Sequence, residues 1–211
     1  MTVRDILIYP QHKAELRRKS DPVAGLNRRV RQLILDLKDT LQASSDGIGL
    51  AAPQINSHQR VVVVRTEADS DESDEPGLPI ALVNPKIIEA SDERKDFDGC
   101  LSFPGLYGET SRPHRLRVTG LGEDGKSFDR VYEGFDAVVV HHEIDHLDGV
   151  LFIDRIESLD DLYRVYMDGN GKPVQVPISE IVPAIRLTGI AERRTFIRFS
   201  CPSKYHILLY L

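Results

Sequence analysis

A short histidine motif constrains this chain more than any other feature of its sequence. Residues 142–146 read His-Glu-Ile-Asp-His, inside a segment of helical length and spacing at 135–147 that Gly134 and Gly149 bound. Residues four apart lie on one face of a helix, one turn apart, so the two imidazoles can bind one cation. Glu143 projects beside them, where its carboxylate can act on a metal-bound water. The motif predicts a metal-binding helix, and its plain alternative is an exposed helix face with two solvated histidines.

A catalytic site of this kind needs a third protein ligand and one open position for water. The metzincin pattern places a third histidine at position 152, which is Phe152 here, so that pattern is excluded. Glu157 offers a carboxylate downstream, and Cys100 offers a thiolate upstream in a Gly-flanked turn. A single cysteine is more often a small buried apolar residue than a ligand. The residue types alone leave the third ligand open.

The remaining hydrophobic pattern predicts a second helix and several strands. Apolar residues recur at helical spacing from 26 to 41, with charged residues between them, which is typical of an amphipathic helix laid on a core. Strands are predicted at 61–64, a run of four valines, at 81–85 and 86–89 as a pair, and at 114–119 before an Asp124-Gly125 turn. Short strands with turn signals between them indicate antiparallel sheet.

Two stretches carry weaker signals. Residues 67–79 are acidic and poor in apolar side chains, which is typical of a solvated loop. Beyond Ile156 the pattern fades: residues 168–171 indicate a turn, and the last twenty residues fit no template.

Composition excludes several classes of protein. A chain of 211 residues normally forms one domain around a single core. With 27 Lys and Arg against 33 Asp and Glu, the net charge of −6 disfavours broad binding to nucleic acid or to an anionic membrane. No apolar run is long enough to span a bilayer, and the N-terminus lacks the pattern of a signal peptide. Two cysteines are too few for a disulfide framework, so we expect a cytoplasmic protein.

Three motifs in order resemble the peptide deformylases. They are Gly-Ile-Gly-Leu-Ala-Ala-Pro-Gln at 47–54, Gly-Cys-Leu-Ser at 99–102 and His-Glu-Ile-Asp-His-Leu-Asp-Gly at 142–149, and the similarity runs from about Ile6 to Ile156. The resemblance implies an α+β fold with antiparallel β-sheets around the central metal-binding helix and the N-terminal amphipathic helix outside. It also implies a catalytic domain at 1–156 and a C-terminal extension at 157–211.

The function implied by this resemblance is that of a metal-dependent amidohydrolase acting on linear amides. The family removes the formyl group from the N-terminal formylmethionine of newly synthesised polypeptides. By resemblance, the metal ligands are Cys100, His142 and His146, and Glu143 is the general acid/base when metal-bound hydroxide attacks. The implied cofactor is one divalent metal ion, Fe(II), with Zn, Co or Ni as alternatives that suit the same ligands.

The resemblance assigns the substrate contacts as well. Gln54 and the backbone N–H of Leu101 are the expected oxyanion donors. The backbone of Ile48 and Gly49 is expected to pair with the peptide, and Val138 and Val139 to line the methionine pocket. The expected partners are N-formylmethionyl nascent peptides and the ribosome through its nascent chain, with no nucleic acid bound directly and no membrane.

Two residues depart from the family pattern. Asp98 stands where the family usually has Glu, and we expect it to pair with Arg112. His141 stands where the family usually has Gln, and it points about 100° away from His142, so we do not expect it to be a ligand. Asp145 either orients a ligand histidine or neighbouring backbone, or is a solvated helical residue.

Two other functions remain open at this level. One is a different metalloenzyme on the same scaffold, a peptidase or a deacylase acting on another N-blocked substrate. The other is a non-catalytic homologue that binds nascent peptides or metal.

Overall fold

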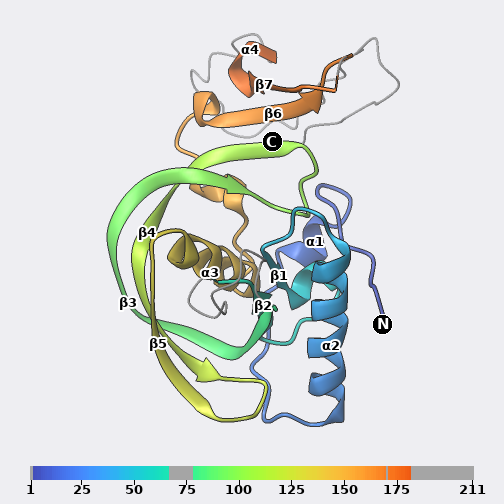
Figure 1. Ribbon diagram of the computed structural model, residues 1–211, viewed down its shortest axis with the longest axis vertical. Helices are drawn as coiled ribbons and strands as arrows, with labels where there is room; N and C mark the ends of the chain where they lie inside the picture. Colours follow the sequence, from blue (N-terminus) through green and yellow to red (C-terminus); the bar gives the residue numbers. More distant parts are fainter. Residues whose placement is uncertain (1, 67–77, 170, 182–211) are drawn as a thin grey trace.

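The computed structural model describes residues 2–66, 78–169 and 171–181 (Figure 1). The acidic segment predicted as a loop lies outside these residues except for its last two positions, and the last twenty residues of the chain lie outside them entirely. No helix in the described ranges is long and apolar enough to cross a membrane.

The described strands form one antiparallel sheet that curls around a helix (Figure 1). Neighbours in the sheet follow the order β1-β2-β3-β4-β6-β7, and β5 pairs with β4. The strands are β1 (Gly49–Ala51), β2 (Val61–Val64), β3 (Ile80–Gly99), β4 (Leu106–Leu121), β5 (Ser127–Glu133), β6 (Leu162–Met167) and β7 (Pro173–Pro177).

The two longest helices lie on different sides of this sheet. The helices are α1 (Lys13–Leu16), α2 (Arg28–Ala43), α3 (Gly134–Leu147) and α4 (Ile178–Ile181), with short 3₁₀ turns η1 (Ala52–Ile55), η3 (Phe152–Arg155) and η4 (Leu159–Asp161). Helix α3 lies inside the curl of β3, β4 and β5, whereas α2 lies outside, beside β1 and β2 (Figure 1). The predicted α+β class and the central position of the histidine helix are therefore confirmed.

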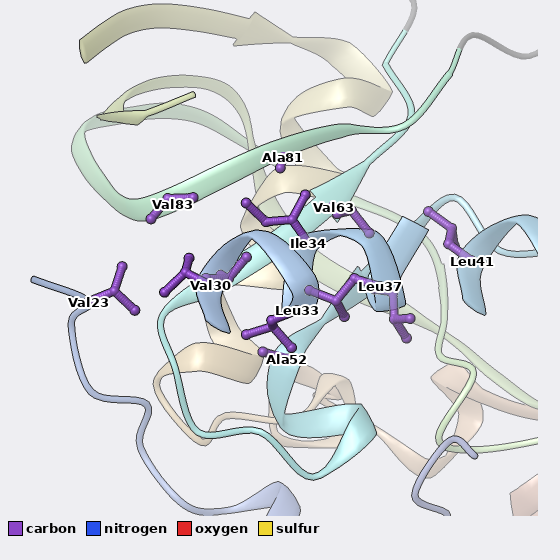
Figure 2. Close-up of a cluster of buried hydrophobic side chains, with 12 residues drawn as sticks. Val23, Val30, Leu33, Ile34, Leu37, Leu41, Ala52, Val63, Ala81 and Val83 are labelled. Carbon is purple, nitrogen blue, oxygen red and sulfur yellow. The ribbon is translucent and has the colours of Figure 1, made fainter. Parts of the chain in front are cut away.

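Helix α2 confirms the predicted amphipathic helix. Asn27 caps its first turn, because the side-chain oxygen accepts a hydrogen bond of 3.0 Å from the Val30 N–H. Its buried face packs with β1, β2 and β3 in the apolar cluster of Figure 2. The members of this cluster on α2 are Val30, Leu33, Ile34, Leu37 and Leu41.

The four valines of β2 pack into two apolar clusters, one on each face of the sheet. Val61 and Val63 face the cluster under α2, while Val62 and Val64 belong to a second cluster between the sheet and α3. Successive side chains of a strand point to opposite faces, so a strand covered on both faces is apolar at every position. This explains the unbroken valine run.

The predicted pair of short strands at 81–85 and 86–89 is wrong. Residues 80–99 form a single strand of 20 residues, β3. Asn84 has a positive φ of 51°, and the pairing with β4 shifts register between Val83 and Lys86. The Asn84 amide accepts from the Val23 N–H at 2.9 Å and donates to the Val23 carbonyl at 2.8 Å. The Asn-Pro sequence thus bends one strand at a bulge and does not separate two strands.

The chain beyond residue 156 adds to the same sheet. Strand β6 pairs with β4 at residues 106–108, and β7 pairs with β6. The predicted turn at 168–171 falls between β6 and β7, with residue 170 outside the described residues, and the Gly171 N–H donates to the Asp168 carbonyl at 3.0 Å. The division of the chain between 156 and 157 stays a prediction.

Candidate metal centre

Two segments far apart in the sequence bring three metal-ligating side chains together. His142 and His146 lie one turn apart on α3, and Cys100 lies in the turn that follows β3. One ligand atom from each residue lies within 4.8 Å of the other two, and the Cys100 Sγ is 3.2 Å from the His146 Nε2. Glu157, the alternative third ligand, instead pairs with Lys95 at 3.3 Å on the surface. The third member of the cluster is therefore Cys100.

The chemistry of this donor set fits a divalent transition metal. A thiolate and two imidazoles are ligands that zinc and iron accept in tetrahedral sites with one open position. Burial lowers the pKa of His146, which keeps its imidazole in the neutral form that binds metal. The His142 Nδ1 is engaged by a carboxylate, which leaves its Nε2 for a metal.

Asp98 fixes the orientation of His142. The His142 Nδ1 donates to the Asp98 Oδ1 at 2.8 Å, and Arg112 donates from Nε to the Asp98 Oδ2 at 2.8 Å. Thr110 donates to the same oxygen at 3.0 Å. Burial opposes ionisation of Asp98, but His142 and Arg112 together hold the pKa of its carboxyl well below the usual range. The predicted pair between Asp98 and Arg112 is confirmed.

Arg112 is fully buried and connects the metal centre to a second carboxylate. Its guanidinium donates to the Asp145 Oδ2 at 2.8 Å and to the His141 Nδ1 at 2.8 Å. Asp145 also accepts from Arg155 at 2.7 Å, so it is a buried ion-pair partner and not a solvated residue. Arg112 links it to His142, because the Arg112 Nη2 lies 3.4 Å from the His142 Nδ1 and the same guanidinium binds Asp98. Burial lowers the pKa of His141 to about 4, and this residue is not part of the metal cluster, as expected.

Glu143 is buried beside the two ligand histidines. Its exposed fraction is 4%, and its Oε2 has no hydrogen-bond partner among the described residues. Burial raises the pKa of its carboxyl to about 7. Gly49 leaves the space that this side chain occupies, because a Cβ at Gly49 would lie 2.4 Å from the Glu143 Oε1. Gly49, the second glycine of the first motif, therefore packs closely against the Glu143 side chain, which would have to shift if a Cβ were added.

Gln54 lies on η1 with its amide facing the ligand turn. Its Oε1 accepts from the Ala51 N–H at 2.8 Å, which fixes the amide so that its Nε2 points at the ligand turn. The Nε2 donates to the Ser102 Oγ at 3.2 Å and lies 3.5 Å from the Cys100 Sγ. An oriented, uncharged donor thus stands next to the cluster.

The residues predicted to contact substrate come from β1 and the residue before it, from α3 and from the turn after Cys100. β1 is at one end of the strand order, so one of its edges is unpaired among the described strands, and Ile48 immediately precedes it. Val138 and Val139 are buried on α3, and Val139 packs in the second apolar cluster. Leu101 follows Cys100 directly and packs against the cluster under α2.

Sequence reasoning missed three residues of this site. Ser102 orients Gln54, Thr110 supports Asp98, and Arg155 neutralises Asp145. Ser102 belongs to the second motif, where its position next to the cysteine is the available signal. Thr110 and Arg155 carry no signal, because only the fold brings them to the network.

Comparisons with known sequences agree with this geometry. A family model described as polypeptide deformylase matches residues 3–161. The chain is 42% identical over 158 residues to the peptide deformylase of Thermomicrobium roseum, which covers 75% of this chain and 88% of the relative. It is 40% identical over 160 residues to peptide deformylase 1 of Pseudomonas syringae pv. tomato, with 75% and 90% covered.

Solved structures are similar over the same part of the chain. The crystal structure of a peptide deformylase from Legionella pneumophila matches with a TM-score of 0.66 and 36% identity, covering 75% of this chain and 88% of that chain. A peptide deformylase from Ehrlichia chaffeensis, solved in complex with actinonin, matches with a TM-score of 0.66 and 32% identity, covering 75% of this chain and 91% of that chain. A peptide deformylase from Acinetobacter baumannii, solved with Met-Ala-Ser bound, matches with a TM-score of 0.65 and 30% identity, covering 74% of this chain and 100% of that chain.

Proposed function

The chain belongs to the peptide deformylase family, and from this membership we infer that it is a metal-dependent hydrolase that removes the N-formyl group from newly made polypeptides. The observation that carries this function is the convergence of Cys100, His142 and His146 next to the buried Glu143. Cys100, His142 and His146 would hold a divalent cation, which would supply Lewis acidity for the formyl carbonyl and would lower the pKa of a water bound to it from 15.7 towards about 7. The remaining chemistry comes from the side chains of the chain itself.

Glu143 is the general acid/base of the proposed mechanism. Its carboxylate takes a proton from the attacking water and returns it to the amine that leaves. Burial raises the pKa of this carboxyl, so its carboxylate is a stronger base than that of an exposed glutamate and accepts the water proton more readily. Transfer of this kind contributes about 10²–10⁴ in rate.

Gln54 and the Leu101 backbone N–H are the proposed oxyanion donors. Attack on the formyl carbonyl places negative charge on its oxygen, and donors aimed at that position stabilise it. Support comes from the Gln54 amide, which Ala51 orients and whose Nε2 lies 3.5 Å from the Cys100 Sγ. The amide donates without adding a charge to the site.

The unpaired edge of β1 supports a peptide bound as an added strand. Ile48 and Gly49 would offer their backbone groups to it, and Val138 and Val139 would contact the methionine side chain. Met-Ala-Ser bound to the Acinetobacter baumannii relative is a peptide with methionine first, which supports this class of substrate here. Three ligands and Gln54 surround the scissile group, so the smallest acyl group, formyl, is favoured over acetyl.

Three finer assignments belong to the same proposal. The metal is Fe(II), with Zn, Co and Ni as alternatives, because thiolate and imidazole ligands suit all four. The protein meets its substrates at the ribosome, through the nascent chain, in the cytoplasm. The catalytic part is residues 1–156, and the family match at 3–161 supports a boundary near that position.

Formate and acetate release from matched peptides tests the activity. Under anaerobic conditions, we expect formyl-Met-Ala-Ser to release formate much faster than acetyl-Met-Ala-Ser releases acetate. Equal rates would indicate a general deacylase, fragments from an unblocked peptide would indicate a peptidase, and no formate from metal-loaded protein would indicate a binding protein.

Two variants distinguish the role of metal binding from the role of proton transfer. Cys100→Ala removes one of three ligands and should lose most of the metal after dialysis, whereas Glu143→Ala should retain metal and lose at least about 10²-fold in turnover. Cys201→Ala is the matched cysteine control and should behave as the unchanged protein. Full metal retention in Cys100→Ala would remove this residue from the ligand set.

A further inference from the structure

A polar hollow is lined by the last residue of η1, Ile55, and by the loop that follows it. Its volume is about 1020 Å³, and none of the metal ligands lines it. Its walls come from the N-terminal segment, the segment after α1, the first turns of α2 and residues 55–59. Four arginines line it: Arg4, Arg18, Arg28 and Arg29.

Three of these arginines have no acidic partner within the described part of the chain. Asp36 is already occupied, because it accepts from Arg4 at 2.7 Å and from Gln32 at 2.8 Å. Asp21 is the other carboxylate in the wall. Arg18, Arg28 and Arg29 are exposed and form no ion pair with any described residue, so this hollow is positive in a chain whose net charge is −6.

The positions of Arg28 and Arg29 are unfavourable for helix stability. They are the first two residues of α2, and the first turn of this helix contains no acidic residue. The N-terminus of a helix carries a partial positive charge, so cations there are destabilising and an anion is stabilising. An anion that binds in front of Arg28 and Arg29 would reduce the electrostatic repulsion between these two cations and the positive end of the helix.

The remaining wall identifies the chemistry of the anion. Small-ligand sites are mostly apolar and enclose the ligand, whereas this wall consists mainly of exposed arginines and of amide, hydroxyl and imidazole groups. Arg, Asn, Gln and Ser side chains are the groups that contact the phosphates and sugars of nucleic acids. The polar members are Gln32, Asn56, Ser57, His58 and Gln59.

We propose that this hollow binds the phosphate backbone of single-stranded RNA through Arg18, Arg28 and Arg29. The choice of RNA rests on the proposed function, since newly made polypeptides grow next to ribosomal RNA; the phosphate chemistry rests on the hollow alone. This site differs from the sequence expectation of no direct nucleic-acid contact, because only the fold brings Arg18 into one hollow with the adjacent pair Arg28 and Arg29.

Anisotropy of a fluorescein-labelled 12-nucleotide oligouridine, titrated with metal-loaded full-length protein, tests the proposal. We expect a dissociation constant of about 10⁻⁴–10⁻⁶ M, because a few phosphate contacts give the affinity of non-specific binding. Arg28→Gln/Arg29→Gln should weaken binding at least tenfold. The slope of log K against log salt should fall by about 1.4, since each phosphate contact on a single strand contributes about 0.7.

The matched control is Arg94→Gln/Arg115→Gln, which removes the same charge from exposed pairs on β3 and β4. It should bind RNA within twofold of the unchanged protein. Equal losses in both double variants, or no anisotropy change at all, would overturn the site. Displacement of the RNA by tripolyphosphate or by polyglutamate at equal charge concentration would overturn RNA as the ligand.

Formate release is measured on the same preparations. Arg28→Gln/Arg29→Gln should deformylate formyl-Met-Ala-Ser at the rate of the unchanged protein, and its melting temperature should be equal or higher, because the opposing charges have been removed from the helix start. A lower melting temperature would contradict the helix argument. Loss of formate release by the unchanged protein would refute the proposed function and leave the anisotropy result to be judged separately.

Discussion

At the scale of single residues, one buried guanidinium organises the site. Arg112 donates to Asp98 and to Asp145, so two carboxylates stay ionised inside the fold. The planar fork of an arginine suits this role, since it offers five donors in fixed directions. Asp98 stands where the family usually has Glu, and it reaches both His142 and Arg112 at 2.8 Å. The shorter carboxylate therefore satisfies both of its partners.

Asp98→Asn should weaken the metal site and the fold together. The variant leaves Arg112 with one carboxylate instead of two, which costs roughly 3–5 kcal/mol for a broken buried pair. The orienting contact to His142 also weakens, which lowers metal affinity by about 10–100-fold. Metal per chain after dialysis and urea unfolding measure the two effects. Asp92→Asn, in an exposed pair with Arg94 on the same strand, is the control and should cost at most about 1 kcal/mol. Equal results for the two variants would contradict the role of Asp98.

Gly49→Ala should remove activity without removing metal. The added Cβ would lie 2.4 Å from the Glu143 Oε1, so the carboxylate must move from its place beside the ligand histidines. Loss of this positioned group should lower kcat/KM by at least about 10²-fold. Gly25→Ala is the matched control, because a Cβ at Gly25 meets nothing within 4 Å. Formate release at normal rate from Gly49→Ala, with metal content unchanged, would show that Glu143 tolerates displacement.

At the scale of elements, the sequence predicts what depends on local pattern and misses what depends on distant contacts. The sequence predicts α3 from the helical length and spacing of its segment and from the two histidines four residues apart, and it predicts β2 from four consecutive valines. The local pattern predicts two strands where β3 is one, because the bend at Asn84 depends on Val23, 61 residues earlier. The ligand Cys100 followed from resemblance to a family and not from its own local pattern, because its partners lie on α3.

The end of α3 gives a prediction at this scale. Gly149 has a φ of +73°, and a Cβ there would lie 2.2 Å from the Arg17 carbonyl oxygen, which is backbone and moves only with its segment. Gly134, near the start of α3, has a φ of +57° but open space around a Cβ. Gly134→Ala should cost roughly 1 kcal/mol for the left-handed conformation alone. Gly149→Ala should cost clearly more in urea unfolding, and equal midpoints would contradict the close contact with Arg17.

At the scale of the whole molecule, the site depends on three apolar clusters that different parts of the chain share. The sheet carries one cluster under α2 and another around α3. The third cluster joins Leu16, Phe103 and Phe152 to Leu162 and Ile178, so segments on both sides of residue 156 bury each other. A chain divided at that position by its motifs is therefore continuous in its packing. The motifs show where similarity to the family ends, but the shared cluster determines which segments unfold together.

Leu162→Ala tests whether the C-terminal segment unfolds with the metal centre. Leu162 is 6% exposed and packs in the third cluster, so its truncation should cost about 2–5 kcal/mol. Because Leu162 is buried with residues of the catalytic part, calorimetry should show one transition at a lower temperature, and metal should be released in that same transition. Met167→Ala, on the same strand but 67% exposed, should change stability by less than about 0.5 kcal/mol. Two separate transitions, with only the one that releases no metal lowered by Leu162→Ala, would show that residues 157–211 fold as an independent unit.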